Sequence, residues 1–515
     1  MNFIDEKDVL NNYFKLLEQD KISFLTNNPK TKSKIIDALV KLRDESNLHE
    51  RIQYAKSAWK ILFEAAMSYI DPDKSGYDEL FKYFDTYVDF EELIFASDSF
   101  YRDHTLHCLW VYFLGEYLYF NPEFKFIFKP MFEYKTTLKN IIDDALEMKL
   151  PEITYENLEK ISHNIPDECS IRCISSLTHD LGYPLKKIKK INSSIKKILP
   201  FFGIDQFKEF DFNYQPLHMP VIQDLIYLMG MVFNFSISDN NSGSDHKKFN
   251  EFAHKYFLIN QENSNFIKLN PEIKNISKDE IIEDWKIFNW KLELVSNKAV
   301  QLRYAHDFEV YEHGIMSAYI LFKHLGVFRN IQITDNKNVL SIGSKERKKL
   351  FALSEIFQAI ANHTSKGYKI NEISGTSQIL SFVDEIEEFS RISRADQNRQ
   401  FINEFCKTSI ENENNCFVVS FIFDNEEIAN LDPERAFKGR CQKMLGLLDI
   451  TNLSEDFHIK LKCIGKLPNN DKTYSLEIKN CFAEIKIDGE IIDIPSYLKS
   501  SEFFTTEEYK NFKQS

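Results

Sequence analysis

The chain has 515 residues, of which 43% are hydrophobic and 14% aromatic, so it is predicted to be a folded globular protein with about two to four domains rather than a disordered one. Its formal net charge of −14 argues against indiscriminate binding to nucleic acid or to an anionic membrane. The eight cysteines contain no CxxC pair, which argues against a disulfide framework and against a thiolate zinc site.

The first hundred residues carry apolar side chains at intervals of three and four, the spacing of amphipathic helices. Examples are FKLLEQ, SKIIDALVKL and YAKSAWKILFEAAMSYI, with a break at DPDKSG, residues 71–76. The opening residues lack a basic segment followed by an apolar run, and the longest apolar run, 225–235, is too short to span a bilayer. We therefore expect a soluble, cytoplasmic protein with no membrane partner.

Helical spacing continues through residues 101–200, including a lysine-rich stretch at 185–197. Residues 201–300 are expected to hold mixed helical segments and one loop, 236–246, which is typical of an insertion. Helices are predicted again at 312–326, 350–363 and 377–393.

The pattern changes after about residue 410, where β-branched and aromatic residues predict strands. These are CFVVSFIFD, FHIKLKCIG, TYSLEIKN and CFAEIKIDGEIIDI, with a turn at DGE, 488–490, and a helix, DPERAFKGRCQKMLGLL, after the first strand. The expected fold is mainly α: an N-terminal helical region at 1–100, a helical domain at 101–400 with an insertion around 201–300, and a small α+β domain at 410–500. This last domain is a candidate surface for a protein partner or for a homo-oligomer.

The stretch SLTHDLGYP, residues 176–184, places His179 beside Asp180 just before a Gly-Tyr-Pro breaker, which is expected to end the helix. Taken alone, the pair is explained by a helix end whose side chains satisfy backbone groups. Other predicted helices, however, supply further metal-competent groups, which are His104 and His107 on one helix face, His313, His363 and Asp384. Imidazoles and carboxylates without clustered thiolates favour Mn, Fe, Ni, Zn or Mg.

Each of these residues alone is more often structural than functional, since most buried histidines are satisfied core residues. Asp384 is the strongest candidate because its apolar neighbours predict a buried position. An unpaired buried carboxylate costs several kcal/mol, and a divalent cation would offset that cost.

The order of His107, His179-Asp180 and Asp384 along predicted helices resembles the HD superfamily of metal-dependent phosphohydrolases. The surroundings HCLWV, LTHDLGYP, EHGIMSA, AIxxH and VDEIEEFSR also resemble those of its metal ligands, and the similarity covers residues 100–395. The resemblance implies a helical bundle in which these four residues are the primary ligands of a divalent metal.

The resemblance extends to His313 and His363, which stand where binuclear members of the superfamily carry additional ligands. Asp180 would then bridge two ions. In mononuclear members, histidines in this region instead contact phosphate or protonate the leaving group, so the number of ions stays open at one or two. HDLGYP lacks the lysine of HDIGK, and Asn362 replaces a histidine before His363, which argues against hydrolysis of cyclic di-GMP.

Candidate substrate contacts are Lys186, Lys187, Arg391 and His104. The two lysines follow the His-Asp pair directly. Arg391 lies seven residues, or about two helical turns, beyond Asp384 and is expected on the same helix face. His104 either reaches a second ion or a substrate phosphate, or holds the metal ligands in place. A second His-Asp pair, 306–307, is interpreted as the loop that leads into the helix of His313.

A metal in such a site lowers the pKa of its bound water and neutralises phosphoryl charge, so the expected reaction is hydrolysis of a phosphate ester or anhydride bond. The acidic chain favours a small nucleotide as substrate, such as a deoxynucleoside triphosphate, a cyclic nucleotide or an alarmone. The alternatives are an HD-type nuclease acting on single-stranded nucleic acid and a non-catalytic helical regulatory or interaction module. The expected catalytic residues are Asp180, His313 and His363.

Overall fold

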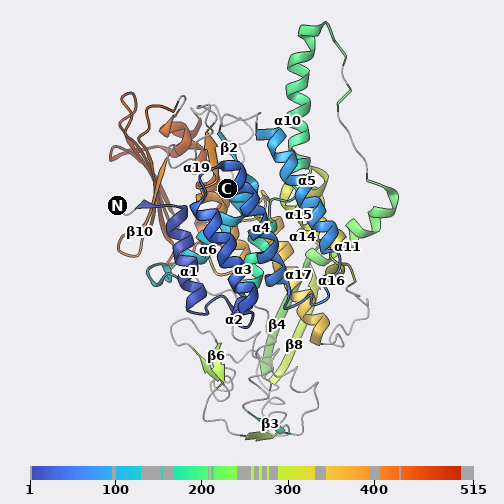
Figure 1. The fold of residues 1–515 in the computed structure, drawn as a ribbon. Coiled ribbons are helices and arrows are strands. Elements are labelled where there is room, and N and C mark those ends of the chain that lie inside the picture. The colour runs from blue at the N-terminus through green and yellow to red at the C-terminus, as the bar shows by residue number, and fades with distance from the viewer. Residues whose placement is uncertain are drawn as a thin grey trace.

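The computed structural model shows a helical body with a β-sheet against one side and two longer projections (Figure 1). One projection is helix α10 (Tyr183–Ile198), and the other is an antiparallel ribbon of β4 (Met231–Asp239) and β8 (Phe288–Ser296). Across the part of the chain that the structure describes, no helix is both long and apolar enough to cross a membrane. The described residues are 3–95, 100–128, 152–154, 168–206, 208–209, 214–239, 257–259, 266–269, 275–277, 288–330, 344–393, 406–428 and 431–499.

The helical character predicted for the N-terminal region is confirmed. Asp5 begins the first helix with a reciprocal capping box, in which its side chain and that of Asp8 each accept a backbone N–H of the other residue. The predicted break at 71–76 takes positive φ angles at Lys74 and Gly76. A Cβ atom on Gly76 would lie 1.9 Å from the carbonyl oxygen of His324, so this position requires glycine. The helices are α1 (Glu6–Glu18), α2 (Ser23–Thr26), α3 (Pro29–Asp44), α4 (Leu48–Met67) and α5 (Tyr77–Phe95).

Helix α9 (Glu168–Thr178) lies at the centre of the body, and every residue from Cys169 to Thr178 is buried. Arg172 on α9 makes a buried bidentate ion pair with Glu116, with N–O distances of 2.7 and 3.1 Å. The helices around α9 are α4, α6 (His104–Phe120), α17 (Ser344–Asn362) and α18 (Thr376–Ile386). The remaining helices of the body are α11 (Met219–Met229), α14 (Lys298–Glu309), α15 (His313–His324) and α16 (Gly326–Arg329).

The N-terminal helices hold the chain where α9 ends. The indole of Trp59, on α4, donates a hydrogen bond to the carbonyl oxygen of Leu177 at 2.6 Å. The hydroxyl of Tyr83, on α5, donates to the carbonyl oxygen of Leu181. The turn between these two carbonyl groups contains the His-Asp pair. It is therefore held in place by hydrogen bonds from α4 and α5.

The region from 201 to 300 contains strands that were not predicted. Strands β4 and β8 pair over their whole length, with Met231 opposite Ser296 and Asp239 opposite Phe288. The apolar run 225–235 masked the alternation in β4 because it crosses from α11 into the strand at Gly230. Part of the predicted loop, 236–239, therefore belongs to β4, and the rest of that loop lies outside the described residues, as does the predicted helical segment before 151. The short strands of this region are β5 (Phe257–Ile259), β6 (Phe266–Leu269) and β7 (Asn275–Ser277), and β7 pairs with the earlier strand β3 (Glu152–Thr154).

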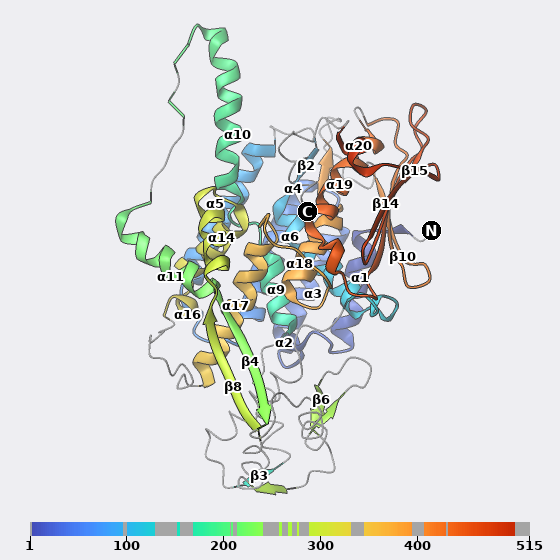
Figure 2. The ribbon, with the colours of Figure 1, turned by 180° about the vertical axis from the view of Figure 1, so that it is seen from behind.

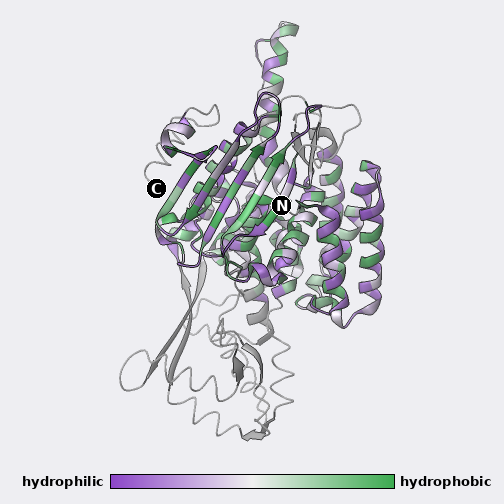
Figure 3. Cartoon of the chain, turned by 90° about the vertical axis from the view of Figure 1, so that its left-hand side faces the viewer, coloured by the Kyte–Doolittle hydropathy of each residue, from purple (hydrophilic) through white to green (hydrophobic). Residues whose placement is uncertain are grey.

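The α+β character of the C-terminal part is confirmed. Its sheet has the order β1-β10-β11-β12-β13-β14-β15, in which β11 and β12 are parallel and all other neighbours antiparallel. Figure 3 looks onto this sheet, in which β12 alternates between hydrophilic and hydrophobic residues and β11 is buried along its whole length. The strands are β1 (Phe3–Ile4), β10 (Lys407–Asn412), β11 (Phe417–Phe423), β12 (His458–Gly465), β13 (Thr473–Lys479), β14 (Phe482–Ile487) and β15 (Glu490–Ile492).

Helix α19 (Pro433–Leu447) joins the two parallel strands and packs between β12 and α18. Pro433 is in its first turn, as predicted, and the predicted turn at 488–490 has positive φ angles at Asp488 and Gly489. Strand β1 was not predicted, and it joins the start of the chain to the edge of the C-terminal sheet. Single-turn helices and a short ribbon complete the fold: η1 (Pro122–Phe124), η2 (Leu199–Phe202), η3 (Pro216–His218), η6 (Ile450–Asn452), α20 (Ile494–Lys499), β2 (Phe100–Arg102) and β9 (Arg391–Ser393).

Candidate metal centre

The His-Asp pair lies in a tight turn between two buried helix ends. Helix α9 ends at Thr178, and α10 begins at Tyr183 with Pro184 in its first turn. The prediction that Gly-Tyr-Pro ends the helix is therefore wrong for its last two residues, which begin the next one. The fixed φ of proline suits the first turn of a helix, where its missing N–H costs no hydrogen bond.

Gly182 allows this turn to lie directly against α15. A Cβ atom on Gly182 would be 2.3 Å from the carbonyl oxygen of His313 and 2.4 Å from Cβ of Met316. The hydroxyl of Ser317 accepts the N–H of Gly182 at 2.7 Å and lies 2.6 Å from the carbonyl oxygen of His179, to which it can donate. This close approach brings His313, the first residue of α15, to the His-Asp pair.

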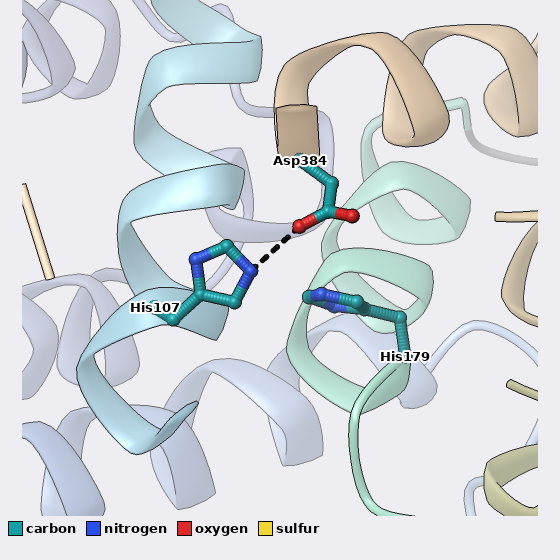
Figure 4. A group of neighbouring side chains, drawn as sticks. All are labelled: His107, His179 and Asp384. Carbon is teal, nitrogen blue, oxygen red and sulfur yellow. Dashed lines mark hydrogen bonds and ion pairs between the residues drawn. The ribbon is translucent and has the colours of Figure 1, made fainter. Parts of the chain in front are cut away.

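We call one part of the site the inner half: His107, His179, Asp384 and Oδ2 of Asp180. Nε2 of His107 lies 2.8 Å from Oδ1 of Asp384 and 3.8 Å from Oδ2 of Asp180, and Nε2 of His179 lies 3.4 Å from the same oxygen. Both imidazoles are fully buried. Figure 4 shows His107 facing Asp384 across the gap between α6 and α18, with His179 beside them. One ligand atom from each of these three residues lies within 4.8 Å of the others.

The outer half consists of His313, His363 and Oδ1 of Asp180. Nε2 of His313 is 3.1 Å and Nε2 of His363 is 3.6 Å from this oxygen, and the two nitrogens are 3.3 Å apart. The structure thus gathers at one point all six residues that the sequence suggested as ligands. Asp180 presents one carboxylate oxygen to each half.

Two of the histidines are held by buried carboxylates that the sequence analysis missed. Nδ1 of His107 lies 2.5 Å from Oε2 of Glu387, and Nδ1 of His104 contacts Oε1 of Glu91. Because an ionised carboxylate only accepts hydrogen bonds, each contact fixes the proton on Nδ1 and turns Nε2 toward the site as a lone-pair donor. A signal was present for Glu387, which lies three residues after Asp384 and hence one helical turn away.

Backbone carbonyl groups hold two other histidines in the same way. Nδ1 of His179 lies 2.7 Å from the carbonyl oxygen of Ser176, and Nδ1 of His363 contacts the carbonyl oxygen of Ile360. Each of these acceptors is three residues earlier in the chain, so the helix end itself orients the ring. These four imidazoles, like that of His313, direct Nε2 toward Asp180.

Burial sets the charge of the site. It lowers the pKa of His179 to about 3 and that of His313 to about 4, so both imidazoles are neutral at pH 7. Burial also acts to raise the pKa of Asp180, but the imidazoles of His179, His313 and His363 outweigh it and bring that pKa well below its ordinary value. Neutral imidazoles around an ionised carboxylate are the protonation states that a divalent cation requires.

Cys108 lies beside the inner half, with its sulfur 3.8 Å from Nδ1 of His179. Burial raises the pKa of this thiol well above its ordinary value. Because the thiolate is the form that binds metals, Cys108 is a poor ligand and contributes packing.

His104 and Lys187 meet at Tyr183, next to the site. Nε2 of His104 is 4.0 Å from Oδ2 of Asp180, and its ring lies on that of Tyr183 with centroids 3.8 Å apart. Lys187 is buried, and its ammonium lies 4.5 Å from the centre of the same tyrosine ring. This cation–π contact turns Lys187 toward Tyr183.

Lys186 occupies the exposed rim. Its Nζ lies 2.7 Å from Oε2 of Glu312 and 3.5 Å from Nδ1 of His313. The side chain is 45% exposed, so it can turn toward an incoming anion without leaving a buried charge behind.

Arg391 does not continue the helix of Asp384, and that prediction is wrong. Helix α18 ends at Ile386, and Glu387 takes extended backbone while its carboxylate contacts His107. Arg391 belongs to β9, opposite residue 102 of β2, and its side chain lies outside what the structure describes.

The second His-Asp pair, 306–307, is also not a loop. It lies in α14, which begins after the N-cap Asn297 and ends at Glu309. Asp307 is buried and His306 is exposed on the opposite side of that helix. The predicted loop is limited to the residues after Glu309, where Tyr311 has a positive φ angle.

The two halves fit divalent cations. Nε2 of His179 is buried and makes no hydrogen bond to any residue that the structure describes, a costly state that a cation would relieve. The mixture of imidazole and carboxylate donors suits Mn, Fe, Ni or Zn, and Mg less well. No protein-family model, no curated protein and no solved structure matches this chain. The function is therefore inferred from the geometry of the site.

Proposed function

We propose that this protein is an HD-type metal-dependent phosphohydrolase that holds two divalent cations, one in each half of the site. The observation that carries the proposal is Asp180, whose two oxygens face separate pairs of imidazoles. A shared carboxylate of this kind suits ions about 3.5–4 Å apart, the spacing of two-metal hydrolytic sites. When bound, such ions supply Lewis acidity, which acidifies an attacking water and neutralises charge on phosphoryl oxygens.

The low pKa of His313 favours a role as ligand over a role as acid. With a pKa of about 4, its imidazole is neutral at pH 7 and is not the imidazolium that would act as the stronger acid toward a leaving oxygen. A site with a single ion would need His313 or His363 for that protonation. The position of Asp180, with two imidazoles facing each of its oxygens, supports the binuclear alternative over the mononuclear one.

His104 is placed to contact an ion, through the lone pair of Nε2, and Lys186 is placed to contact the phosphate of a substrate. His104 directs Nε2 toward Asp180 because Glu91 holds its other nitrogen. Lys186 stands at the exposed rim beside His313. Lys186 lies on the side of the outer half, so we propose that the phosphoryl group binds there, whereas Nε2 of His104 lies 4.0 Å from Oδ2 of Asp180, the oxygen of the inner half.

A small nucleotide is the substrate class that we propose. The net charge of −14 opposes binding along a nucleic acid, where each phosphate requires a cation to replace its counterion. Among the described residues at the rim of the site, Lys186 has an exposed ammonium group, which suffices for one phosphate group. A nuclease acting on single strands and a non-catalytic module with a structural metal are the competing functions.

The test combines metal analysis with a hydrolysis screen. Wild type, Asp180→Asn and the control His306→Gln would be measured for bound Mn, Fe, Ni, Zn and Mg, and for hydrolysis of nucleoside triphosphates, cyclic nucleotides, dinucleotide alarmones and single-stranded oligonucleotides. We expect about two ions per chain, metal-dependent hydrolysis of a nucleotide by wild type and control, and loss of both properties in Asp180→Asn. Hydrolysis of oligonucleotides alone would favour the nuclease. Tight metal binding without any hydrolysis would favour the non-catalytic module.

A further inference from the structure

Helix α10 projects from the body and ends in an apolar tip. The helix has 16 residues, so it extends about 24 Å at 1.5 Å per residue. Figures 1 and 2 show its outer part standing clear of the body, and we call residues 183–204 the arm. At its end Phe201 and Phe202 are 90% and 74% exposed, and Ile198 and Ile204 are exposed beside them. A cluster of exposed apolar side chains on a polar helix is typical of an interaction site.

The tip is a defined structure. Gly203 has a positive φ angle, and its N–H donates to the carbonyl oxygen of Pro200 at 3.0 Å, which turns the chain back after η2. Lys196 pairs with Glu209 across this turn. The two phenylalanines therefore have a defined position at the end of the arm.

The arm is basic, whereas the rest of the chain is acidic. Its sequence contains six lysines and no acidic residue, so the remainder is even more acidic than the net charge of −14. A second copy of the same chain therefore offers the arm a surface of opposite charge. Such complementarity favours association and steers the encounter.

A cavity on the body matches the arm in charge. It lies between α1, β10 and the end of α6, has a volume of about 640 Å³, and we call it the N-terminal cleft. Four carboxylates, Asp8, Glu123, Glu411 and Glu413, line it together with a single ammonium, Lys15. Oδ1 of Asn12, also in the lining, is buried without a hydrogen bond from any described residue.

The cleft also matches the arm in its apolar contacts. Phe3, Ile4, Tyr117 and Ile410 line it, and Phe3 is 52% exposed. A volume of this size accepts a compact group of side chains. In Figures 1, 2 and 3 the arm rises beyond one end of the body, while the N-terminal strand lies on its side. The arm of the same molecule therefore does not fill the cleft.

We propose that the arm of one copy inserts Phe201 and Phe202 into the N-terminal cleft of a second copy, and that the exchange is reciprocal. Lys197, exposed near the tip, then faces the carboxylates of the cleft. A reciprocal exchange closes a two-fold dimer and uses each surface once, so assembly stops at two copies. The proposed dimer does not depend on the phosphohydrolase function, since neither the tip of the arm nor the cleft contains a residue of the metal site.

The experiment uses two full-length variants, each altered on one surface. The arm variant is Phe201→Ser with Phe202→Ser, and the cleft variant is Glu123→Lys with Glu411→Lys. The control is Leu302→Ser, which removes an equally exposed apolar side chain from α14. Sedimentation velocity over a concentration series gives the dimer dissociation constant, and thermal unfolding verifies that each variant is folded.

We expect wild type and Leu302→Ser to form dimers, and each altered surface to weaken the dimer by at least about tenfold, which corresponds to 1.4 kcal/mol. An equimolar mixture of the two variants is expected to form a 1:1 dimer, because the intact arm of one meets the intact cleft of the other. A monomeric wild type would overturn the proposal. So would a cleft variant that associates as tightly as wild type, since this result would place the arm against another arm or another surface.

Discussion

The two halves of the metal site differ in how completely the protein surrounds the position of an ion. The inner half offers four side-chain ligands, His107, His179, Asp384 and one oxygen of Asp180, and a buried carboxylate orients the first of them. The outer half offers three, and its His313 lies beside the exposed Lys186. Four protein ligands are typical of ions that stay bound, and three leave a position for water or substrate. The inner half is thus built for retention and the outer half for exchange.

The largest expected effect comes from the residue that both halves share. Asp180→Asn keeps the size of the side chain but removes the charge that the two groups of imidazoles face. Loss of several kcal/mol of charge stabilisation corresponds to a fall in kcat of about a thousandfold or more. Bound metal, measured by mass spectrometry after gel filtration, is expected to fall in both halves. Retention of one tightly bound ion would show that the halves are independent.

The second-largest effect is expected from Glu387, a carboxylate that orients a ligand of the inner half. Its two oxygens accept the N–H and the hydroxyl of Ser390 at 2.9 and 2.7 Å, which fixes the carboxylate against Nδ1 of His107. In Glu387→Gln the neutral amide orients the imidazole less firmly and makes it less basic. We expect the affinity of the more tightly bound ion to fall by about 10- to 100-fold, as titration with Co²⁺ and its visible absorption would show.

Glu385→Gln is the matched control for this change. Glu385 lies next to Asp384 on α18, but it pairs with Lys443 away from the site, at 2.7 Å. The control is expected to bind Co²⁺ like wild type. An equal loss in both variants would indicate a general effect of charge on α18 and would contradict a specific role for Glu387.

Gly182 tests the outer half, because it sets the distance between α15 and the His-Asp turn. Gly182→Ala forces a Cβ atom against the carbonyl oxygen of His313, and overpacking of this kind costs about 1–3 kcal/mol. Movement of α15 carries His313 away from Asp180, so the weaker ion should be lost while the tighter one remains. The measurement is urea unfolding together with the metal content.

Gly439→Ala supplies the comparison for that variant. Gly439 lies within α19, and a Cβ atom there would meet nothing within 4 Å. Alanine at an open helical position is expected to stabilise the protein by up to about 1 kcal/mol. If both alanine variants behave alike, the contact between Gly182 and α15 is not what positions the outer half.

The sequence predicted the possible metal ligands better than the residues that orient them. Helical spacing and the HD-type order identified the six residues that the structure gathers, because histidine and aspartate can be recognised as possible metal ligands from their residue type alone. Glu387 and Glu91 were missed because each acts through a contact with a histidine of another helix, α6, and the only local signal was the spacing of Glu387 from Asp384. Arg391 was misplaced for a related reason: the helix of Asp384 stops where Glu387 turns to His107.

In the fold, too, elements with their own periodicity were predicted, and strands that depend on a partner far away in the chain were not. Most helices and the C-terminal strands follow from their own periodicity. The ribbon of β4 and β8 was hidden by the apolar run that crosses Gly230, and β1 has only two residues, too few to show a pattern. Pairings of this kind depend on partners 49 or more residues away in the chain, from Asp239 with Phe288 upward.

The smallest expected effect concerns pH, and it compares His179 of the inner half with His313 of the outer half. Both are neutral, with pKa values of about 3 and about 4, whereas in the unfolded chain they take up protons near pH 6.5. Between pH 6.5 and 4 the unfolded state therefore binds more protons than the folded state, and each residue lowers the stability of the metal-free protein as the pH falls. The slope is at most about 1.4 kcal/mol per pH unit for each histidine. Urea unfolding in EDTA at several pH values should show a smaller slope for His179→Gln and for His313→Gln than for wild type, with His306→Gln unchanged. Below pH 4 the contribution of His313 should level off while that of His179 persists to about pH 3, so equal curves for the two variants would contradict the deeper burial of the inner half.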